Sequence, residues 1–268
     1  MNILRTFKPT NVIFSIFFAL LCSACQGPAN SERAASAPPQ KSSIQKDTFE
    51  QTQPPKKARP QAGHIKQFFL EYGDAHPETL VRLSTRLGEI DIRLYEETPV
   101  HRSNFLYNVN EELYHHTIFY RVVPGFMIQG GNSDHDQTIE KRKEAGAYYI
   151  TNEVRPDLIH KRGAVAMAMS YDDNPDHKSA QYSFYIVIGK RLNDAGLDAV
   201  EEEYQISIPP RAREVYKEIG GSPHLDGVHT VFGEVVEGMD VVEAIAAEKR
   251  DSGNWPINDV VIEYSVLE

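Results

Sequence analysis

Short segments in which apolar and polar residues alternate follow one another through most of the chain from residue 80 onward. Successive side chains of a strand point to opposite faces, so this alternation is typical of strands with one buried face. The predicted strands cover residues 80–84, 90–94, 118–123, 164–169, 184–188, 230–236 and 260–266. Helical periodicity occurs between them in two places, from Pro99 onward and over residues 240–247. A mostly β chain, folded as an antiparallel barrel or sandwich, is therefore favoured over a parallel α/β sheet.

Residues 190–223 do not follow the strand pattern. The segment is rich in Ala, Glu, Arg and Tyr, and its second half runs from Pro209-Pro210 to Gly220-Gly221. A proline at the start and a glycine after the end are typical of a helix, so a helical insertion between two strands is predicted. Insertions generally lie on the surface, which favours a solvated addition and leaves a partner-binding surface as the alternative.

The first 25 residues have the parts of an export signal. Arg5 and Lys8 precede an apolar run over residues 12–21, and small residues lead to Cys25. This run is shorter than the roughly 20 apolar residues that a membrane-spanning helix needs, so residues 1–25 are predicted to be a signal peptide. The end of the run resembles the lipobox of bacterial lipoproteins, which implies lipidation of Cys25. An ordinary secretory signal is the alternative.

The segment that follows the export signal has the composition of a tether. Residues 26–62 contain six of the 16 prolines and one aromatic residue, Phe49. Such a segment cannot bury enough apolar surface to offset its ordering entropy, so it is predicted to be disordered and to precede a folded domain over residues 63–268. A lipid on Cys25 would hold this domain in the cell envelope. Gln26 resembles an outer-membrane sorting signal, so an outer-membrane lipoprotein facing the periplasm is expected.

Charge and cysteine content exclude several classes of function. The chain has 28 Lys and Arg against 38 Asp and Glu, and no basic block that could follow a phosphate backbone, so nucleic acid is not an expected partner. Both cysteines, Cys22 and Cys25, lie near the N-terminus, which leaves no cysteine for a disulfide or a metal site in the domain. Ser170 and Ser183 have no Gly-x-Ser-x-Gly context, so a hydrolase is not supported.

The histidines show no metal-binding spacing. His115 and His116 are adjacent and are expected to point apart, as neighbours do on a helix or a strand. His135, His160 and His177 lie in polar, loop-like sequence. Because a metal site needs convergent ligands at set spacing, solvated histidines are favoured and no metal is expected.

One stretch of fourteen residues combines an arginine at the end of a strand, a Pro-Gly turn, Phe-Met, and a glutamine before two glycines. It reads FYRVVPGFMIQGGN over residues 119–132. Alone, it would indicate a solvated arginine next to core residues. It closely resembles the signature of the cyclophilin-type peptidyl-prolyl isomerases. The resemblance extends over about residues 79–266, with further similar blocks at 88–90, 99–106, 163–168, 179–186 and 225–239.

The resemblance implies both a fold and an activity. The expected fold is a closed eight-stranded antiparallel barrel capped by two helices, with the helical insertion added and the site on the outer face of the barrel. The expected activity is peptidyl-prolyl cis-trans isomerisation, rotation about Xaa-Pro bonds, without a cofactor. The expected partners are proline-containing polypeptides of the cell envelope, whose folding a monomeric enzyme would assist.

Roles carry over to the positions that match the family motif. Arg121 is the expected catalytic residue, because a fixed cation with several donors can localise the lone pair of the prolyl nitrogen. Gln129 is expected to bind the substrate backbone and to hold Arg121, and Ala168 to leave room for the residue before proline. The expected substrate-binding residues are Phe126, Met127, Gln129, Ala168, Tyr185, Leu225 and His229.

The sequence departs from the family pattern at several positions, Tyr120 and Met169 among them, and three of the departures leave a second interpretation open. Ser183 replaces a glutamine, with Gln181 two residues earlier. Tyr185 replaces a phenylalanine, adding a hydroxyl that needs a partner if it is buried. His224 stands where the cyclosporin-sensitive members have a tryptophan. The alternative to an efficient enzyme is therefore a catalytically weak module that binds proline-containing segments.

Overall fold

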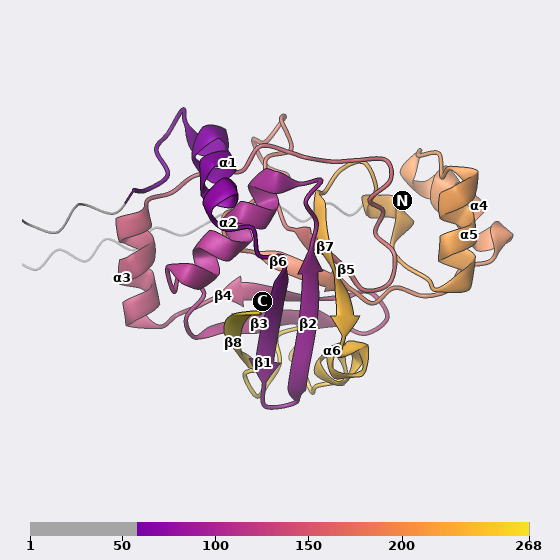
Figure 1. The fold of residues 1–268 in the computed structure, drawn as a ribbon. Helices are drawn as coiled ribbons and strands as arrows, with labels where there is room; N and C mark the ends of the chain where they lie inside the picture. The colour runs from indigo at the N-terminus through magenta and orange to yellow at the C-terminus, as the bar shows by residue number, and fades with distance from the viewer. Residues whose placement is uncertain (1–57, 268) are drawn as a thin grey trace, which may run out of the picture. The chain divides into compact units, whose positions relative to one another are not determined.

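The computed structural model describes residues 58–267, in which eight antiparallel strands form one closed barrel (Figure 1). The order around the barrel is β1-β2-β7-β5-β6-β4-β3-β8. The strands are β1 (Leu80–Thr85), β2 (Gly88–Leu94), β3 (Thr117–Val123), β4 (Met127–Asn132), β5 (Ala164–Met167), β6 (Phe184–Val187), β7 (Val231–Glu237) and β8 (Val261–Leu267). The predicted closed barrel is confirmed. The predicted signal peptide, Cys25 and most of the predicted tether lie outside the described residues.

The alternating segments of the sequence became strands within a few residues of their predicted bounds, whereas β4 had no such signal. Its sequence, MIQGGN, contains two adjacent glycines and no apolar alternation. Gly131 has a φ of +100°, and a Cβ added there would lie 2.2 Å from the Tyr182 carbonyl oxygen. Only glycine allows this backbone to pass so close to the segment before β6.

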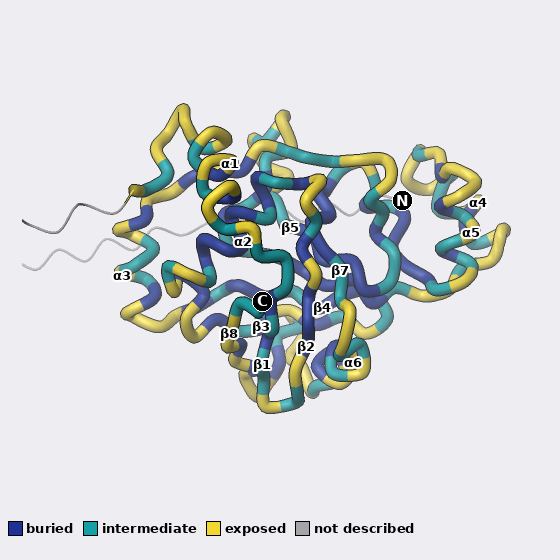
Figure 2. The backbone as a smooth tube through the Cα atoms, in the orientation of Figure 1, coloured by how far each residue is buried: buried dark blue, intermediate teal, exposed yellow. Residues whose placement is uncertain are grey.

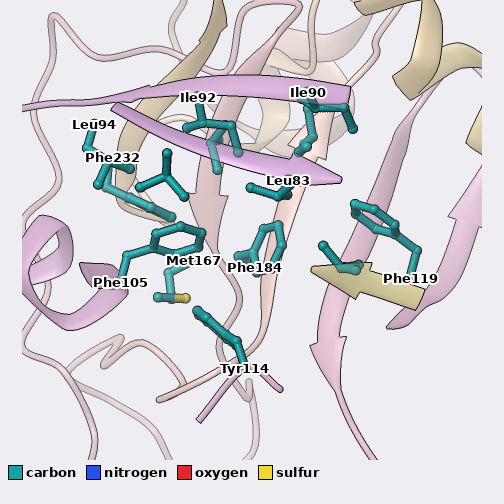
Figure 3. Packing of buried hydrophobic residues seen from close by; sticks show 14 of the residues in the cluster. Leu83, Ile90, Ile92, Leu94, Phe105, Tyr114, Phe119, Met167, Phe184 and Phe232 are labelled. Carbon is teal, nitrogen blue, oxygen red and sulfur yellow. The ribbon is translucent and has the colours of Figure 1, made fainter. Parts of the chain in front are cut away.

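The interior of the barrel is filled by buried apolar side chains. Phe105 of α2 (Pro99–Asn110) packs between Phe184 and Phe232 (Figure 3). The centroid of its ring lies 5.4 Å from the centroid of each of the other two rings. All three rings are fully buried. At another edge of the barrel, α6 (Met239–Ala246) buries Val242 and Ile245 and leaves its other face to solvent (Figure 2). These are the two capping helices that the sequence predicted.

Two further helices have no counterpart in the sequence predictions. α1 (Ile65–Ala75) packs on α2, where Phe68, Phe69 and Tyr72 surround Tyr107 edge to face at centroid distances of 5.3 to 5.7 Å. α3 (Asp136–Ala145) follows β4 and is almost entirely polar. Within residues 58–267 no helix is long and apolar enough to cross a membrane.

The segment between β6 and β7 contains α4 (Asp194–Tyr204), α5 (Pro210–Glu218) and the short 3-10 helix η1 (Pro223–Leu225), and α4 and α5 project to one side of the barrel (Figure 1). This insertion has a small core of its own, made of Leu197, Ile208, Ala212 and Tyr216. Its two ends meet, because Lys190 forms a β-bridge with Gly221. A Cβ added at Gly189 would lie 2.4 Å from the Gly221 Cα, so the two backbones touch at this neck.

Candidate active site

Arg121 reaches the outer face of the barrel because β3 contains an irregularity. In a regular strand Phe119 and Arg121 would point to the same side. The pairing of β3 with β4 shifts register between these two residues, so Phe119 is buried in the barrel core while Arg121 is exposed. Arg121 then lies opposite Gln129 of β4, and its Nη1 donates to Gln129 Oε1 at 3.5 Å.

All eight predicted site residues line one pocket of about 160 Å³ on this outer face. Its floor is apolar, because Met127, Tyr185 and Leu225 belong to a buried cluster separate from the barrel core. Phe126 packs against this cluster and is half-buried. The complete lining is Arg121, Phe126, Met127, Gln129, Ala168, Met169, Tyr171, Tyr185, Leu225 and His229. The site is therefore an apolar recess with a cation and an amide at its edge.

Ser183 holds Gln129 in place. Gln129 Nε2 donates to Ser183 Oγ at 3.1 Å, and the same Oγ lies 2.6 Å from the Tyr120 hydroxyl. The Gln129 amide is thus held through its nitrogen by Ser183, while its oxygen accepts from Arg121. Gln181 does not line this pocket; it is buried, and its Nε2 donates to the Gly146 carbonyl at 3.0 Å.

The added hydroxyl of Tyr185 has a partner. It lies 3.0 Å from Nε2 of His160, whose Nδ1 lies 2.9 Å from Oδ1 of Asp226. A carboxylate only accepts, so Nδ1 donates, and in that tautomer Nε2 accepts the tyrosine hydrogen. Tyr216 of α5 donates to the other carboxylate oxygen at 2.6 Å. A continuous chain of hydrogen bonds thus joins the helical insertion to the wall of the pocket.

Burial favours the uncharged forms of two groups at the site. Burial raises the pKa of Tyr185 well above its usual value. Burial, reinforced by the nearby His160, lowers the pKa of His229 to about 4. His229 Nδ1 donates to the Met167 carbonyl at 3.3 Å, and its Nε2 accepts from the Tyr171 hydroxyl at 2.7 Å. Tyr171, which is 70% exposed, was missed because its loop carries no strand or motif signal.

Two expectations about the histidines were wrong. His160 is fully buried, because Asp226 and Tyr185 satisfy both of its ring nitrogens. His115 and His116 lie in a turn, where His116 has a φ of +49°, and their ring centroids are 4.1 Å apart. Among the described residues, no group of three or more His, Cys, Asp and Glu is placed to hold a metal ion.

The family of the chain follows from its sequence as well as its fold. The model of the family described as cyclophilin-type peptidyl-prolyl cis-trans isomerase/CLD matches residues 80–266, a span that includes the pocket and runs from β1 into β8. The chain therefore belongs to the cyclophilin-type peptidyl-prolyl cis-trans isomerases. Its enzyme class is that of the family, as the sequence predicted.

Named relatives agree with this assignment. A peptidyl-prolyl cis-trans isomerase of Acinetobacter baylyi is 33% identical over 169 residues, which cover 63% of this chain and 72% of that protein. The crystal structure of a cyclophilin-type isomerase from Cryptosporidium parvum is 21% identical, with a TM-score of 0.51, over 71% of this chain and 98% of that chain. A second structure of that isomerase, in the presence of the dipeptide Ala-Pro, has a TM-score of 0.50. Both structural matches show a shared barrel.

Proposed function

We propose that the pocket lined by Arg121 is the catalytic centre, and that it catalyses cis-trans rotation about Xaa-Pro bonds of polypeptides in the cell envelope. The observation that carries this proposal is the placement of the exposed Arg121 guanidinium at the edge of an apolar recess, next to Gln129. The recess is small and apolar on its floor, as a proline ring requires.

Rotation about the bond before proline needs no covalent intermediate. Its barrier of roughly 18–20 kcal/mol comes from amide resonance, which is lost when the nitrogen lone pair becomes localised. Arg121 donates toward the prolyl nitrogen and stabilises this localised form, while Gln129 holds the guanidinium and binds the substrate backbone. The uncatalysed process takes about 10–100 s, so millisecond turnover requires about 10⁴–10⁵-fold acceleration, or roughly 5.5–7 kcal/mol. Orientation and fixed charge together can supply this amount.

A catalytically weak binding module is the competing proposal, and the departures at Ser183 and Tyr185 motivate it. The contacts of both residues favour the enzyme. Ser183 supports Gln129, and the Tyr185 hydroxyl is bound by His160, which leaves the ring to line the pocket. Turnover measurements separate the two proposals, because a module would bind proline peptides and isomerise them slowly.

The catalytic role is tested by isomerisation of an Ala-Pro tetrapeptide by the full chain and its variants. Arg121→Ala is expected to lower kcat/KM by about 10²–10³-fold, the loss typical for removal of one preorganised electrostatic group. Arg86→Ala is the matched control, since Arg86 is a partly exposed arginine of the β1–β2 turn that pairs with Glu248. Equal turnover in the parent and Arg121→Ala would overturn the role of Arg121. Binding without turnover in both would support the module.

We also propose that the chain is exported and lipidated on Cys25, and that it assists the folding of envelope proteins. The support is the sequence alone: a short apolar run, Cys25 and a proline-rich segment before the domain. Expression in a bacterial host, followed by membrane fractionation and mass spectrometry, tests this proposal. Cys25→Ser should release the protein from the membrane fraction and remove the lipid mass, whereas Cys22→Ser should not. An unmodified, soluble parent protein would refute the anchor.

A further inference from the structure

Three aromatic rings extend from the pocket onto the helical insertion. The Phe126 ring, which lines the pocket, lies 5.6 Å from that of His224, and His224 stacks on Tyr204 at 4.8 Å. The angles between the planes are 31° and 30°, so the rings form a gently tilted row. We call Phe126, His224 and Tyr204 the aromatic ledge.

The ledge is continuous with the pocket and open to solvent at its far end. His224 and Leu225 are neighbours in η1, so the helical turn that supplies Leu225 to the pocket floor also supplies the middle ring of the ledge. Phe126 and His224 are half-buried, and Tyr204 at the end of α4 is 46% exposed. A polypeptide that places its proline in the pocket can therefore continue across these rings.

Charge at the far end of the ledge is negative. α4 has the sequence DAGLDAVEEEY and contains no basic residue. Arg213 and Lys217 of α5 pair with its Asp194, Asp198 and Glu201. Glu203, which precedes Tyr204, forms no ion pair with the residues that the structure describes. Its charge acts on the His224 ring.

No positive charge on the ledge opposes a cationic ligand near neutral pH. The pKa of His224 is lowered, chiefly by burial and also by the nearby His160, so the middle ring is largely uncharged there. Lys190 lies at the other end, where its methylene carbons are close to Gly125. An arginine or lysine at the Tyr204 end can contact an aromatic ring and a carboxylate together.

We propose that the aromatic ledge, together with Glu203, binds the polypeptide flanking the proline and selects an arginine or lysine there. The proposal rests on the proposed function, since it extends the same site. The two centroid steps of 5.6 and 4.8 Å put the Tyr204 ring no more than about 10 Å from the Phe126 ring, a length that about three extended residues span. The selected side chain therefore lies within about three positions of the proline.

The test uses the full chain as the enzyme and compares peptides that all contain the same Ala-Pro core. One peptide is a blocked tetrapeptide, and the others extend it by three residues on either side, ending in arginine or in its uncharged analogue citrulline. On one side of the proline, the parent is expected to show a kcat/KM for the peptide extended to arginine that is about 2- to 10-fold higher than its kcat/KM for the matching citrulline peptide. This preference should weaken as the salt concentration is raised. Peptide affinities are measured in parallel.

Two variants alter the far end of the ledge and leave the residues that line the pocket unchanged. Tyr204→Ala and Glu203→Gln should abolish the arginine preference while turnover of the tetrapeptide stays unchanged. Tyr149→Ala and Glu218→Gln are the matched controls, because Tyr149 is an exposed tyrosine outside the pocket lining and Glu218 is an exposed carboxylate at the end of α5. Both controls should keep the preference.

The outcomes separate the ledge from the proposed function. Equal kcat/KM for arginine and citrulline on both sides, or a preference that survives Tyr204→Ala, would overturn the ledge even if the tetrapeptide is turned over. Absence of tetrapeptide turnover, or turnover indifferent to Arg121→Ala, would overturn the catalytic proposal. In that case, tighter binding of the arginine peptide that is lost in Tyr204→Ala would still support the ledge, and equal affinities would refute it.

Discussion

Replacing Tyr185 by phenylalanine tests whether its hydrogen bond stabilises the pocket or takes part in the reaction. The hydroxyl is 3.0 Å from His160 Nε2, and His160 is fully buried. Tyr185→Phe therefore leaves a buried acceptor without its donor, which costs about 1–3 kcal/mol of unfolding free energy. The ring remains in the pocket, so kcat/KM should change by less than about threefold, the shift that well under 1 kcal/mol would cause.

A double-mutant cycle makes the reasoning refutable. His160→Leu alone leaves both the Tyr185 hydroxyl and Asp226 short of a partner, and should cost about 3 kcal/mol or more. Combining it with Tyr185→Phe removes one of these unpaired groups. The free energy of unfolding of the double variant should therefore exceed the value predicted from the sum of the two single changes by at least about 1 kcal/mol. Urea unfolding at pH 7 gives the free energies, and isomerisation of the Ala-Pro tetrapeptide gives the activity.

The control for this cycle is Tyr149→Phe, which removes the hydroxyl of a tyrosine that is 64% exposed. It should change stability by less than about 0.5 kcal/mol. Additive free energies within about 0.3–0.5 kcal/mol would show that Tyr185 and His160 are not coupled. A tenfold or larger loss of kcat/KM in Tyr185→Phe would show that the hydroxyl acts on the substrate.

Two further predictions concern pH and backbone. His229 has a folded-state pKa of about 4, so between pH 6.5 and 4 the unfolded chain binds a proton that the folded one does not. The free energy of unfolding should therefore fall by up to about 3 kcal/mol as the pH is lowered through this range. His229→Asn should flatten this part of the stability profile, and parallel profiles for parent and variant would contradict the assignment. Gly131→Ala places a Cβ 2.2 Å from the Tyr182 carbonyl at a φ of +100°, so thermal unfolding should show a loss of at least about 2 kcal/mol, and an unchanged melting temperature would be contrary to expectation.

The sequence was informative wherever local pattern decides structure. Alternation located most strands, and the proline at residue 99 marked the start of α2. The signal for α1 was also present, because Ile65, Phe68, Phe69 and Tyr72 have helical spacing. The three aromatic rings pack on Tyr107 of α2 in the structure. α3 had no such signal. Its Arg142 holds it in place by donating to the carbonyls of Leu113 and Gly131 at 2.9 Å.

The composition of the site was predictable only through the family motif. Period-two spacing puts Phe119 and Arg121 on one face, and the register shift in β3 that separates them has no local sequence signal. His160 and Asp226 are 66 residues apart, and no spacing rule brings them to Tyr185. Tyr171 lines the pocket from a loop that carries no motif signal. Tyr204 stacks on His224 from the insertion, where the resemblance to the family breaks.

The neck at Gly189 and Gly221 has an evolutionary consequence. The chain leaves the barrel and returns to it at almost the same point, so everything between these glycines can change length without altering the strand register of β6 or β7. Such a segment can be replaced as one unit. Related barrels could acquire, lose or trade it in one genetic event, provided that Asp226 keeps a hydrogen-bond donor in place of Tyr216.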